Sequence, residues 1–467
     1  MQQKNKIHLK QLLVLLFGLA LWFTPVPDGL TPQAWHLFAI FISIIVAVIF
    51  EAAPIFTSSI IGLAAVVLTG TLTHKQAYSG FSEGFILLII VAFLIARGVI
   101  KSGLGKRIAF LIIQKFGKSS LGLGYSIIAA DMFIAPAFPS NTARSGVLYP
   151  IVNALAADSG SKVADGTRKR IGAYLMMTSM AGITISSTMW LTAMAANPAG
   201  AKMAQDFGVN ITYGSWALAA SVPSLLAFLT IPWLLMKVFP PELKETPEAP
   251  KIAKAELEKM GAMSRNEYIT AGTFLSMVTL WVFSSSLGLD KTAIAFLGLG
   301  VLMLSNIFTL EDLANEGRAL GTLVWFAILF SMSNYLNQFG FMTWLGGYIS
   351  VWVDGLSWPI VYVSLIVGYV LIHYFFVSQT AQMLALFSVF LHVGISAGVP
   401  PEMMALMLLF ATNFNAIITP QGSSANVIYL GSGYLESREV YKYGGIITLV
   451  NTVIYLGVGT AWMMLIL

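Results

Sequence analysis

Two short polar stretches interrupt apolar sequence, one in each half of the chain. They are Pro139-Ser140-Asn141-Thr142-Ala143 and Val377-Ser378-Gln379-Thr380-Ala381. Ser and Asn are poor helix formers because their side chains compete for backbone hydrogen bonds. Pro136 and Pro139 disfavour a continuous helix at the first stretch still further. Each stretch therefore predicts a helix break between two apolar arms.

The composition is that of a membrane protein. Of the 467 residues, 57% are hydrophobic and 10% are charged, and the mean hydropathy is +0.80, whereas a soluble domain carries about 25% charged residues. At about 20 residues per span, the chain has room for about ten to twelve spanning helices. The formal net charge of +5 is small for this length, so we expect no nucleic-acid partner. The predicted fold is an all-α polytopic membrane protein in the lipid bilayer.

The residue types needed for metal or nucleophilic chemistry are scarce. The chain has no Cys and five His, and no two His stand at the i, i+3 or i+4 spacing of a helical metal site. No Ser–His pair and no catalytic Asp pair stands out in the apolar stretches. We therefore expect no metal, no cofactor and no enzymatic activity, with a membrane protease or lipid transferase as the opposing class.

Basic residues predict how the chain is oriented. Lys4, Lys6 and Lys10 precede the first apolar run at 12–23, and further basic residues gather at 101–118, 162–170 and 237–266. Cytoplasmic loops carry the excess of Lys and Arg, so we expect a multi-pass protein of the cell membrane with a cytoplasmic N-terminus. The sequence after residue 23 lacks the small-residue pattern of a cleavage site, and the first run is expected to be kept as a span.

The polar segment 237–266 predicts a division of the chain into two related halves. These are a first half at 1–236, a cytoplasmic linker at 237–266 and a second half at 267–467. Gly103 precedes Ser140 by 37 residues, and Gly340 precedes Ser378 by 38. The matched spacing of Gly and polar break is typical of an internal repeat.

The charges around the breaks predict that the repeat is inverted. Lys118 and Lys162 bracket the first break, which places both ends of its hairpin in the cytoplasm. The second break lies in a region without Lys or Arg between Arg318 and Arg438, so its ends are expected outside. Two re-entrant hairpins that enter from opposite sides, with broken helices, point to a substrate site near the middle of the bilayer.

The chemistry of the breaks favours an anion. Helix N-termini present free N–H groups and a partial positive charge, and Ser, Thr, Asn and Gln add neutral donors. Two facing tips would grip the two ends of a dicarboxylate. The candidate substrate-binding residues are Ser140, Asn141, Thr142, Ser378, Gln379, Thr380, Asn197, Pro198, Thr419 and Pro420. The opposing interpretations are hydrogen bonds between neighbouring helices for the tripeptides and simple kinks for the two Pro motifs.

Three further residues carry or lack charge near the tips. Arg144 is the candidate for compensating the charge of a bound dianion, and the matching residue of the second half, Gln382, is neutral. Asp131 lies in an apolar stretch, where an acid is a functional candidate by default. Its other interpretation is a structural pair with a nearby base.

At these residues the chain resembles the divalent anion/sodium symporters, which carry a Ser-Asn-Thr signature at each of two hairpin tips. The phrase Pro139-Ser140-Asn141-Thr142-Ala143-Arg144 is similar to the exchanger branch, with its bacterial citrate/succinate and plastid 2-oxoglutarate/malate antiporters. The resemblance implies a homodimer of an elevator-type transporter, with scaffold and transport domains interleaved in the sequence. It also implies hairpins at about 121–157 and 358–396, completed by helices broken near Asn197 and Thr419-Pro420.

The chain departs from the symporter signature at two positions. Gln379 replaces Asn in the second tip, and Arg144 follows the first tip as a fixed cation that would stand in for sodium. We therefore expect exchange of dicarboxylates of the 2-oxoglutarate, malate, succinate and fumarate class, without sodium. A sodium-coupled dicarboxylate symporter is the alternative, and a channel is a further one. Counting donors does not separate a dicarboxylate from a tricarboxylate.

Overall fold

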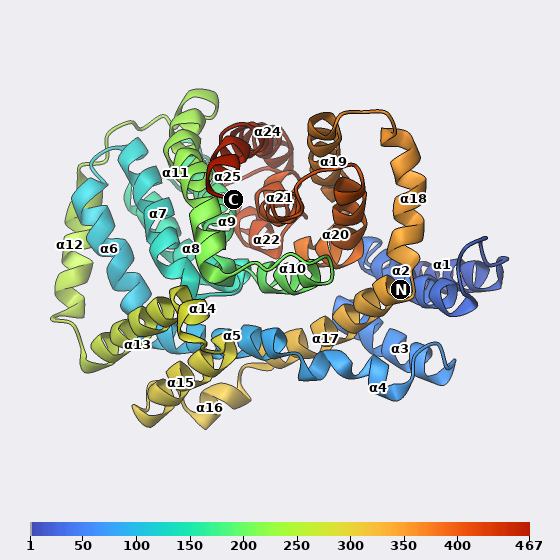
Figure 1. Cartoon of the computed structure of the whole chain (residues 1–467). Helices are drawn as coiled ribbons and strands as arrows, with labels where there is room; N and C mark the ends of the chain where they lie inside the picture. Colours follow the sequence, from blue (N-terminus) through green and yellow to red (C-terminus); the bar gives the residue numbers. More distant parts are fainter. Residues whose placement is uncertain (1) are drawn as a thin grey trace.

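The computed structural model describes residues 2–467, without the side chains of residues 2–6 and of Arg318. Within this part of the chain the regular structure is helical, and the only β-type pairing is an isolated bridge between Ser119 and Glu245. Figure 1 shows the whole bundle. The prediction of an all-α fold is confirmed.

The first half, up to the polar linker, contains eleven α-helices among the described residues. They are α1 (Gln2–Phe23), α2 (Pro32–Ile49), α3 (Ile55–Leu68), α4 (His74–Ala77), α5 (Gly84–Ser102), α6 (Leu104–Phe116), α7 (Ser120–Ile134), α8 (Asn141–Asp158), α9 (Gly172–Met189), α10 (Ala196–Gln205) and α11 (Tyr213–Val238). The linker itself contains α12 (Glu248–Met260), which packs on α6.

The second half contains thirteen α-helices among the described residues. Its helices are α13 (Arg265–Val282), α14 (Ser284–Leu287), α15 (Lys291–Leu304), α16 (Leu310–Ala314), α17 (Gly317–Gln338), α18 (Phe341–Val353), α19 (Trp358–Ile372), α20 (Gln379–Ser396), α21 (Pro401–Phe414), α22 (Ser424–Gly431), α23 (Ser437–Glu439), α24 (Gly445–Ile454) and α25 (Thr460–Ile466). Two π-helical segments, Val440–Gly444 and Tyr455–Gly459, join the last three helices into one long rod.

Eight helical stretches are long and apolar enough to cross a membrane within the described residues. Four more apolar helices, among them α3 and α18, are shorter. The sequence-based expectation of about ten to twelve full spans is therefore reached only when the short helices are included. The difference arises because the chain divides several apolar runs at Gly or polar residues.

The glycines that the sequence matched do occupy equivalent places. Gly103 separates α5 from α6 with φ +82°, and Gly340 separates α17 from α18 with φ +81°. Both lie in the left-handed region, which costs a non-Gly residue about 1–2 kcal/mol. The helices that follow, α6 and α18, each have 13 residues. The repeat thus extends to the backbone conformation of single residues.

The two polar breaks form two matching hairpins. α7 and α19 each have 15 residues, and α8 and α20 each have 18. A short 3-10 turn ends the first arm in both, and Ser140 and Ser378 then cap the second arms with φ, ψ of −148°, 119° and −148°, 121°. In Figure 1 the two hairpins lie on either side of α21 and α22.

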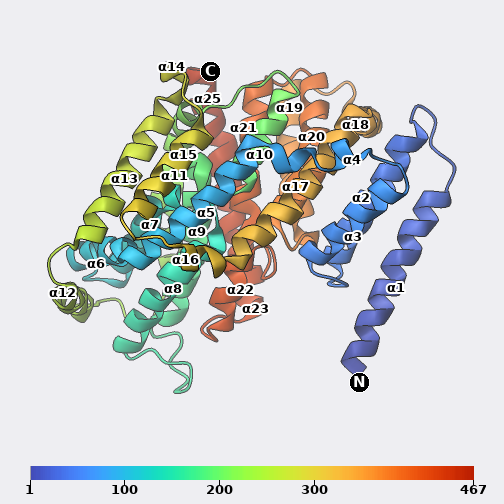
Figure 2. The ribbon, with the colours of Figure 1, turned by 90° about the horizontal axis from the view of Figure 1, so that it is seen from below.

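Two further helices are broken at their middle. A 3-10 turn at Leu191–Ala193 separates α9 from α10, and another at Asn415–Ile417 precedes the turn into α22. Figure 2 shows which segments lie at each edge of the bundle. Toward the lower edge lie the start of α1, the helices α12 and α23, and the end of α8, and the C-terminus lies at the upper edge. The outer end of the first hairpin is tied to the linker, because Ser120 N–H donates to Lys244 O at 2.9 Å.

Replacing Gly103 by Ala tests the left-handed junction. The added Cβ would have its nearest neighbour at 3.8 Å, so crowding is absent and the backbone strain of about 1–2 kcal/mol remains. We expect Gly103→Ala to lower the thermal unfolding midpoint of the detergent-solubilised protein. The control is Gly300→Ala inside α15, where helix propensity predicts a gain of about 0.5–1 kcal/mol. Equal midpoints for the two variants would contradict the assignment.

Candidate functional site

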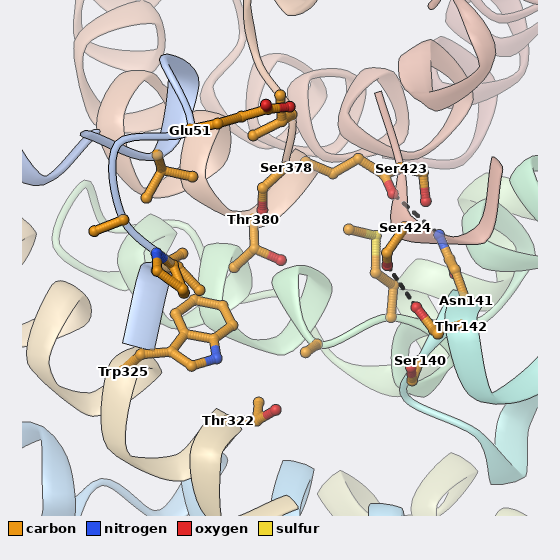
Figure 3. A pocket seen from close by; sticks show the side chains of 18 of the residues that line it. Glu51, Ser140, Asn141, Thr142, Thr322, Trp325, Ser378, Thr380, Ser423 and Ser424 are labelled. Atoms are coloured by element: carbon orange, nitrogen blue, oxygen red, sulfur yellow. Dashed lines mark hydrogen bonds between the residues drawn. The ribbon is translucent and has the colours of Figure 1, made fainter. Parts of the chain in front are cut away.

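The hairpin tips meet at a cavity of about 680 Å³. Figure 3 shows it with Ser140, Asn141 and Thr142 on one wall and Ser378 and Thr380 on another. Gln379 lines the cavity as well. The structure therefore brings together all six residues of the two predicted tripeptides. Their middle residues, Asn141 and Gln379, are 238 positions apart in the sequence.

The two tip amides brace one another. Asn141 Nδ2 donates to Gln379 Oε1 at 3.1 Å, and Gln379 Nε2 donates to the backbone carbonyls of Thr412 at 2.7 Å and Asn413 at 3.2 Å. Gln379 reaches these carbonyls because its side chain is one methylene longer than that of Asn. With the amides so occupied, the hydroxyls and the first backbone N–H groups of α8 and α20 are the donors left for a ligand.

A third capped helix completes the cavity. Ser423 caps α22, its hydroxyl accepting from Ala425 N–H, and Ser424 Oγ lies 2.5 Å from Thr142 Oγ1. Both serines line the cavity, as does Ala195 at the start of α10. Sequence reasoning missed Ser423 and Ser424. The Gly-Ser-Ser phrase at 422–424 inside apolar sequence was the available signal, because Ser is a preferred N-cap residue.

The helix ends give the cavity its electrostatic character. The N-termini of α8, α20 and α22 all point their free N–H groups toward it, each carrying about half a positive charge. No Lys or Arg is among the described residues that line the cavity, and Glu51 is the one charged residue there. Such a wall binds an anion through dipoles and neutral donors rather than through basic side chains.

Arg144 is not among the described residues that line this cavity, and its compensation of a bound dianion stays a prediction. Its side chain is fully buried, and Nη1 lies 2.8 Å from Asp131 Oδ2. It also donates to the hydroxyls of Ser186 and Ser187 and, at 2.8 Å, to Asn141 Oδ1. Asp131 therefore pairs with a nearby base, and Arg144 acts on the tip by holding the Asn141 amide.

The second half places a neutral group at the equivalent point. Gln382 Nε2 donates to the carbonyl of Tyr369, which is 13 positions earlier, as Asp131 is 13 positions before Arg144. His373 Nδ1 lies 2.6 Å from Gln382 Oε1, and its Nε2 lies 2.9 Å from the carbonyl of Gly422. Gln382 is fully buried, so the position equivalent to Arg144 in the second half holds a neutral side chain with neutral hydrogen-bond partners.

The four Pro-motif candidates do not line the cavity. Asn197, Pro198 and Thr419 are buried behind it, and Pro420 is partly buried. Asn197 Nδ2 donates to the carbonyls of Ser187 and Trp190, and its Oδ1 accepts from Asn413. Asn197 thus ties together the broken helices beside the tips, and a direct contact of the four residues with substrate stays a prediction.

The chain is similar to known membrane transporters along most of its length. The family model described as the sodium:sulfate symporter transmembrane region matches residues 5–467. The chain is 43% identical over 97% of its length to a Bacillus subtilis (strain 168) protein named "Putative malate transporter YflS", covering 95% of that protein. It is 43% identical over 95% of its length to the chloroplastic dicarboxylate transporter 1 of Arabidopsis thaliana, covering 81% of it.

A solved structure shares the fold. The Alcanivorax borkumensis YdaH transporter, described as having an unusual topology, superposes with a TM-score of 0.61 at 15% identity, over 86% of this chain and 89% of that one. The fold is that of a polytopic membrane protein, and the family model and the names of the relatives indicate a transporter rather than an enzyme. More narrowly, the chain belongs to the sodium:sulfate symporter family, the divalent anion/sodium symporters.

Removing either partner of the buried ion pair tests the role of Arg144. Arg144→Ala leaves Asp131 as an unpaired buried charge, which costs about 3–5 kcal/mol. We expect each single variant, Arg144→Ala and Asp131→Ala, to unfold at a lower temperature and the double variant to lose less than the sum of the two single losses. Lys101→Ala, which breaks a surface pair with Asp312, is the control and should cost about 1 kcal/mol or less. Additive losses in the double variant would contradict the pairing.

Shortening Gln379 tests the bracing of the tips. In Gln379→Asn the amide cannot hold Asn141 and the carbonyls of Thr412 and Asn413 together, so one or two hydrogen bonds of about 0.5–1.5 kcal/mol each are lost. A double-mutant cycle with Asn141→Ala, followed by thermal unfolding, measures the coupling. We expect the combined loss to be smaller than the sum of the single losses. Strict additivity would show that the two amides do not interact.

Proposed function

We propose that this protein transports dicarboxylates of the 2-oxoglutarate, malate, succinate and fumarate class. The observation that carries the proposal is that three serine-capped helix N-termini converge on a cavity whose described lining residues include no Lys or Arg. Two of them, at Ser140 and Ser378, are related by the internal repeat, which suits a ligand with an anionic group at each end. The names of the relatives, a malate transporter and dicarboxylate transporters, support the same class.

We further propose that transport is an exchange. An empty cavity exposes the partial positive charges of several helix ends, and a bound dianion balances them. The protein with bound substrate then changes between its inward-facing and outward-facing states more readily than the empty protein. Sodium is not needed to organise the first tip, because Arg144 already holds Asn141. Carbonyls at the breaks are also taken, since Asn426 Nδ2 donates to Ala416 and Thr419.

The movement we propose is that of an elevator. The hairpins α7–α8 and α19–α20, with α9, α10, α21 and α22, would form the transport domain, and α2, α3, α5 and α17 would belong to the scaffold of a homodimer. Each domain would draw on both 1–236 and 267–467, joined by the linker 237–266. By the excess of basic residues, the N-terminus and α12 would face the cytoplasm of a cell membrane.

One observation favours a sodium-coupled symporter instead. Asn413 Oδ1, Asn415 Oδ1 and Thr419 Oγ1 are buried at the break between α21 and α22 and make no hydrogen bond with the described residues. Oxygens without a hydrogen-bond partner suit a hard cation such as sodium. The description of the matching family model also names a sodium symporter. This alternative and exchange differ in what drives uptake.

Uptake into liposomes separates the two. Purified protein is reconstituted, and labelled succinate uptake is followed into empty vesicles and into vesicles loaded with unlabelled 2-oxoglutarate, each with and without a sodium gradient. We expect uptake only into loaded vesicles, unaffected by sodium. Sodium-driven uptake into empty vesicles would establish the symporter. Uptake that fails to saturate with succinate would favour a channel.

A further inference from the structure

Glu51 lies on the wall of the cavity, in a turn that belongs to neither hairpin. It follows α2 in the short turn to α3 and is exposed. Figure 3 shows its side chain on the same side of the cavity as Ser378, across from Asn141 and Ser140. Of the described lining residues it alone carries a charge, and it makes no ion pair with any described residue.

The turn holds Glu51 in an unusual backbone conformation. Its φ is +54°, one of two positive values among the described non-Gly residues. The left-handed region costs such a residue about 1–2 kcal/mol, and strain of this kind persists where the surroundings enforce it. Here the backbone N–H of Ala52 donates to Ala47 O at 2.8 Å, and Gln11 Nε2 of α1 donates to Ala52 O at 3.1 Å. The carboxylate is therefore presented to the cavity by a fixed turn.

A carboxylate in this place opposes the rest of the site. The helix N-termini attract an anion, whereas Glu51 repels it, and a second negative charge on the ligand doubles the repulsion. We propose that Glu51 weakens the binding of dianionic substrate in the orientation seen here and so hastens its release on that side of the membrane. This rests on the proposed dicarboxylate transport.

The effect belongs to one side because of where Glu51 is attached. The turn between α2 and α3 lies in the proposed scaffold, whereas the tips that hold the substrate lie in the proposed moving part. When the tips move to the other side of the membrane, Glu51 stays behind. The side concerned is that of the N-terminal half of α1, because Ile7 and Gln11 also line the cavity. Glu51 thus makes substrate affinity unequal on the two faces.

The size of the effect follows from Coulomb's law in a wet cavity. A single charge and a dianion that are separated by about 8–10 Å in a water-filled space interact by enough to change affinity about threefold to tenfold, and salt screens the interaction. A structural role for Glu51 would show no such dependence on salt or on ligand charge.

The test is a measurement of KM on each face. Right-side-out and inside-out membrane vesicles carrying the full-length protein are loaded with unlabelled 2-oxoglutarate, and the KM for labelled succinate is measured in 50 mM and 500 mM salt. Three variants are compared. Glu51→Gln removes the charge and keeps the shape, whereas Glu51→Asp keeps the charge in a residue that tolerates the left-handed region. The control, Glu242→Gln, removes an exposed acid of the linker, away from the cavity.

We expect Glu51→Gln to lower KM about threefold to tenfold on one face at low salt, with less than a twofold change on the other face and a smaller effect at high salt. Glu51→Asp and Glu242→Gln should keep the unmodified KM. Equal shifts on both faces, a shift that ignores salt, or no shift would overturn the role of Glu51 while leaving dicarboxylate transport intact. Failure of the unmodified protein to transport any dicarboxylate would overturn both proposals.

Discussion

Every helix end at membrane depth must find partners for its backbone N–H and C=O groups within the protein or a cavity, because the hydrocarbon core of the bilayer offers none. In this protein serine side chains meet part of that demand at three of the helix ends that border the cavity, through Ser140, Ser378 and Ser423. The remaining first-turn N–H groups then face the cavity. The serine caps that stabilise the broken helices therefore also shape the proposed anion site, and the hairpins, the turns and the cavity all depend on them.

The site is symmetric in backbone and asymmetric in charge. The capping residues Ser140 and Ser378 differ by 2° in ψ and have equal φ. Beneath them, however, one half buries the ion pair of Arg144 and Asp131, and the other buries the neutral contact of Gln382 with His373. A buried ion pair is costly to desolvate and is kept where it fixes a geometry. Here it fixes Asn141, whose amide in turn meets Gln379 from the other half.

Much of the fold was predictable from residues whose backbone preferences are strong. Gly103 and Gly340 permit a left-handed backbone, and the polar tripeptides interrupt apolar sequence, so the repeat and both hairpins could be located. Glu51 could not be found this way, because a lone acid between apolar runs looks like any loop residue. The ion pair of Arg144 with Asp131 was only one of the alternatives that the sequence left open. Sequence shows that a charge is present but not whether a partner such as Asp131 already balances it.

The sequence by itself determined where the helices break, how the halves correspond and that the breaks carry neutral donors. These features are local, since they follow from Gly, Pro and Ser preferences and from the apolar period of each segment. Only the tertiary structure decided that the two tips touch through Asn141 and Gln379, that Ser424 joins them and that Arg144 is withdrawn from the cavity. Those contacts join residues more than 200 positions apart or depend on burial, and neither is encoded in any single stretch of the chain.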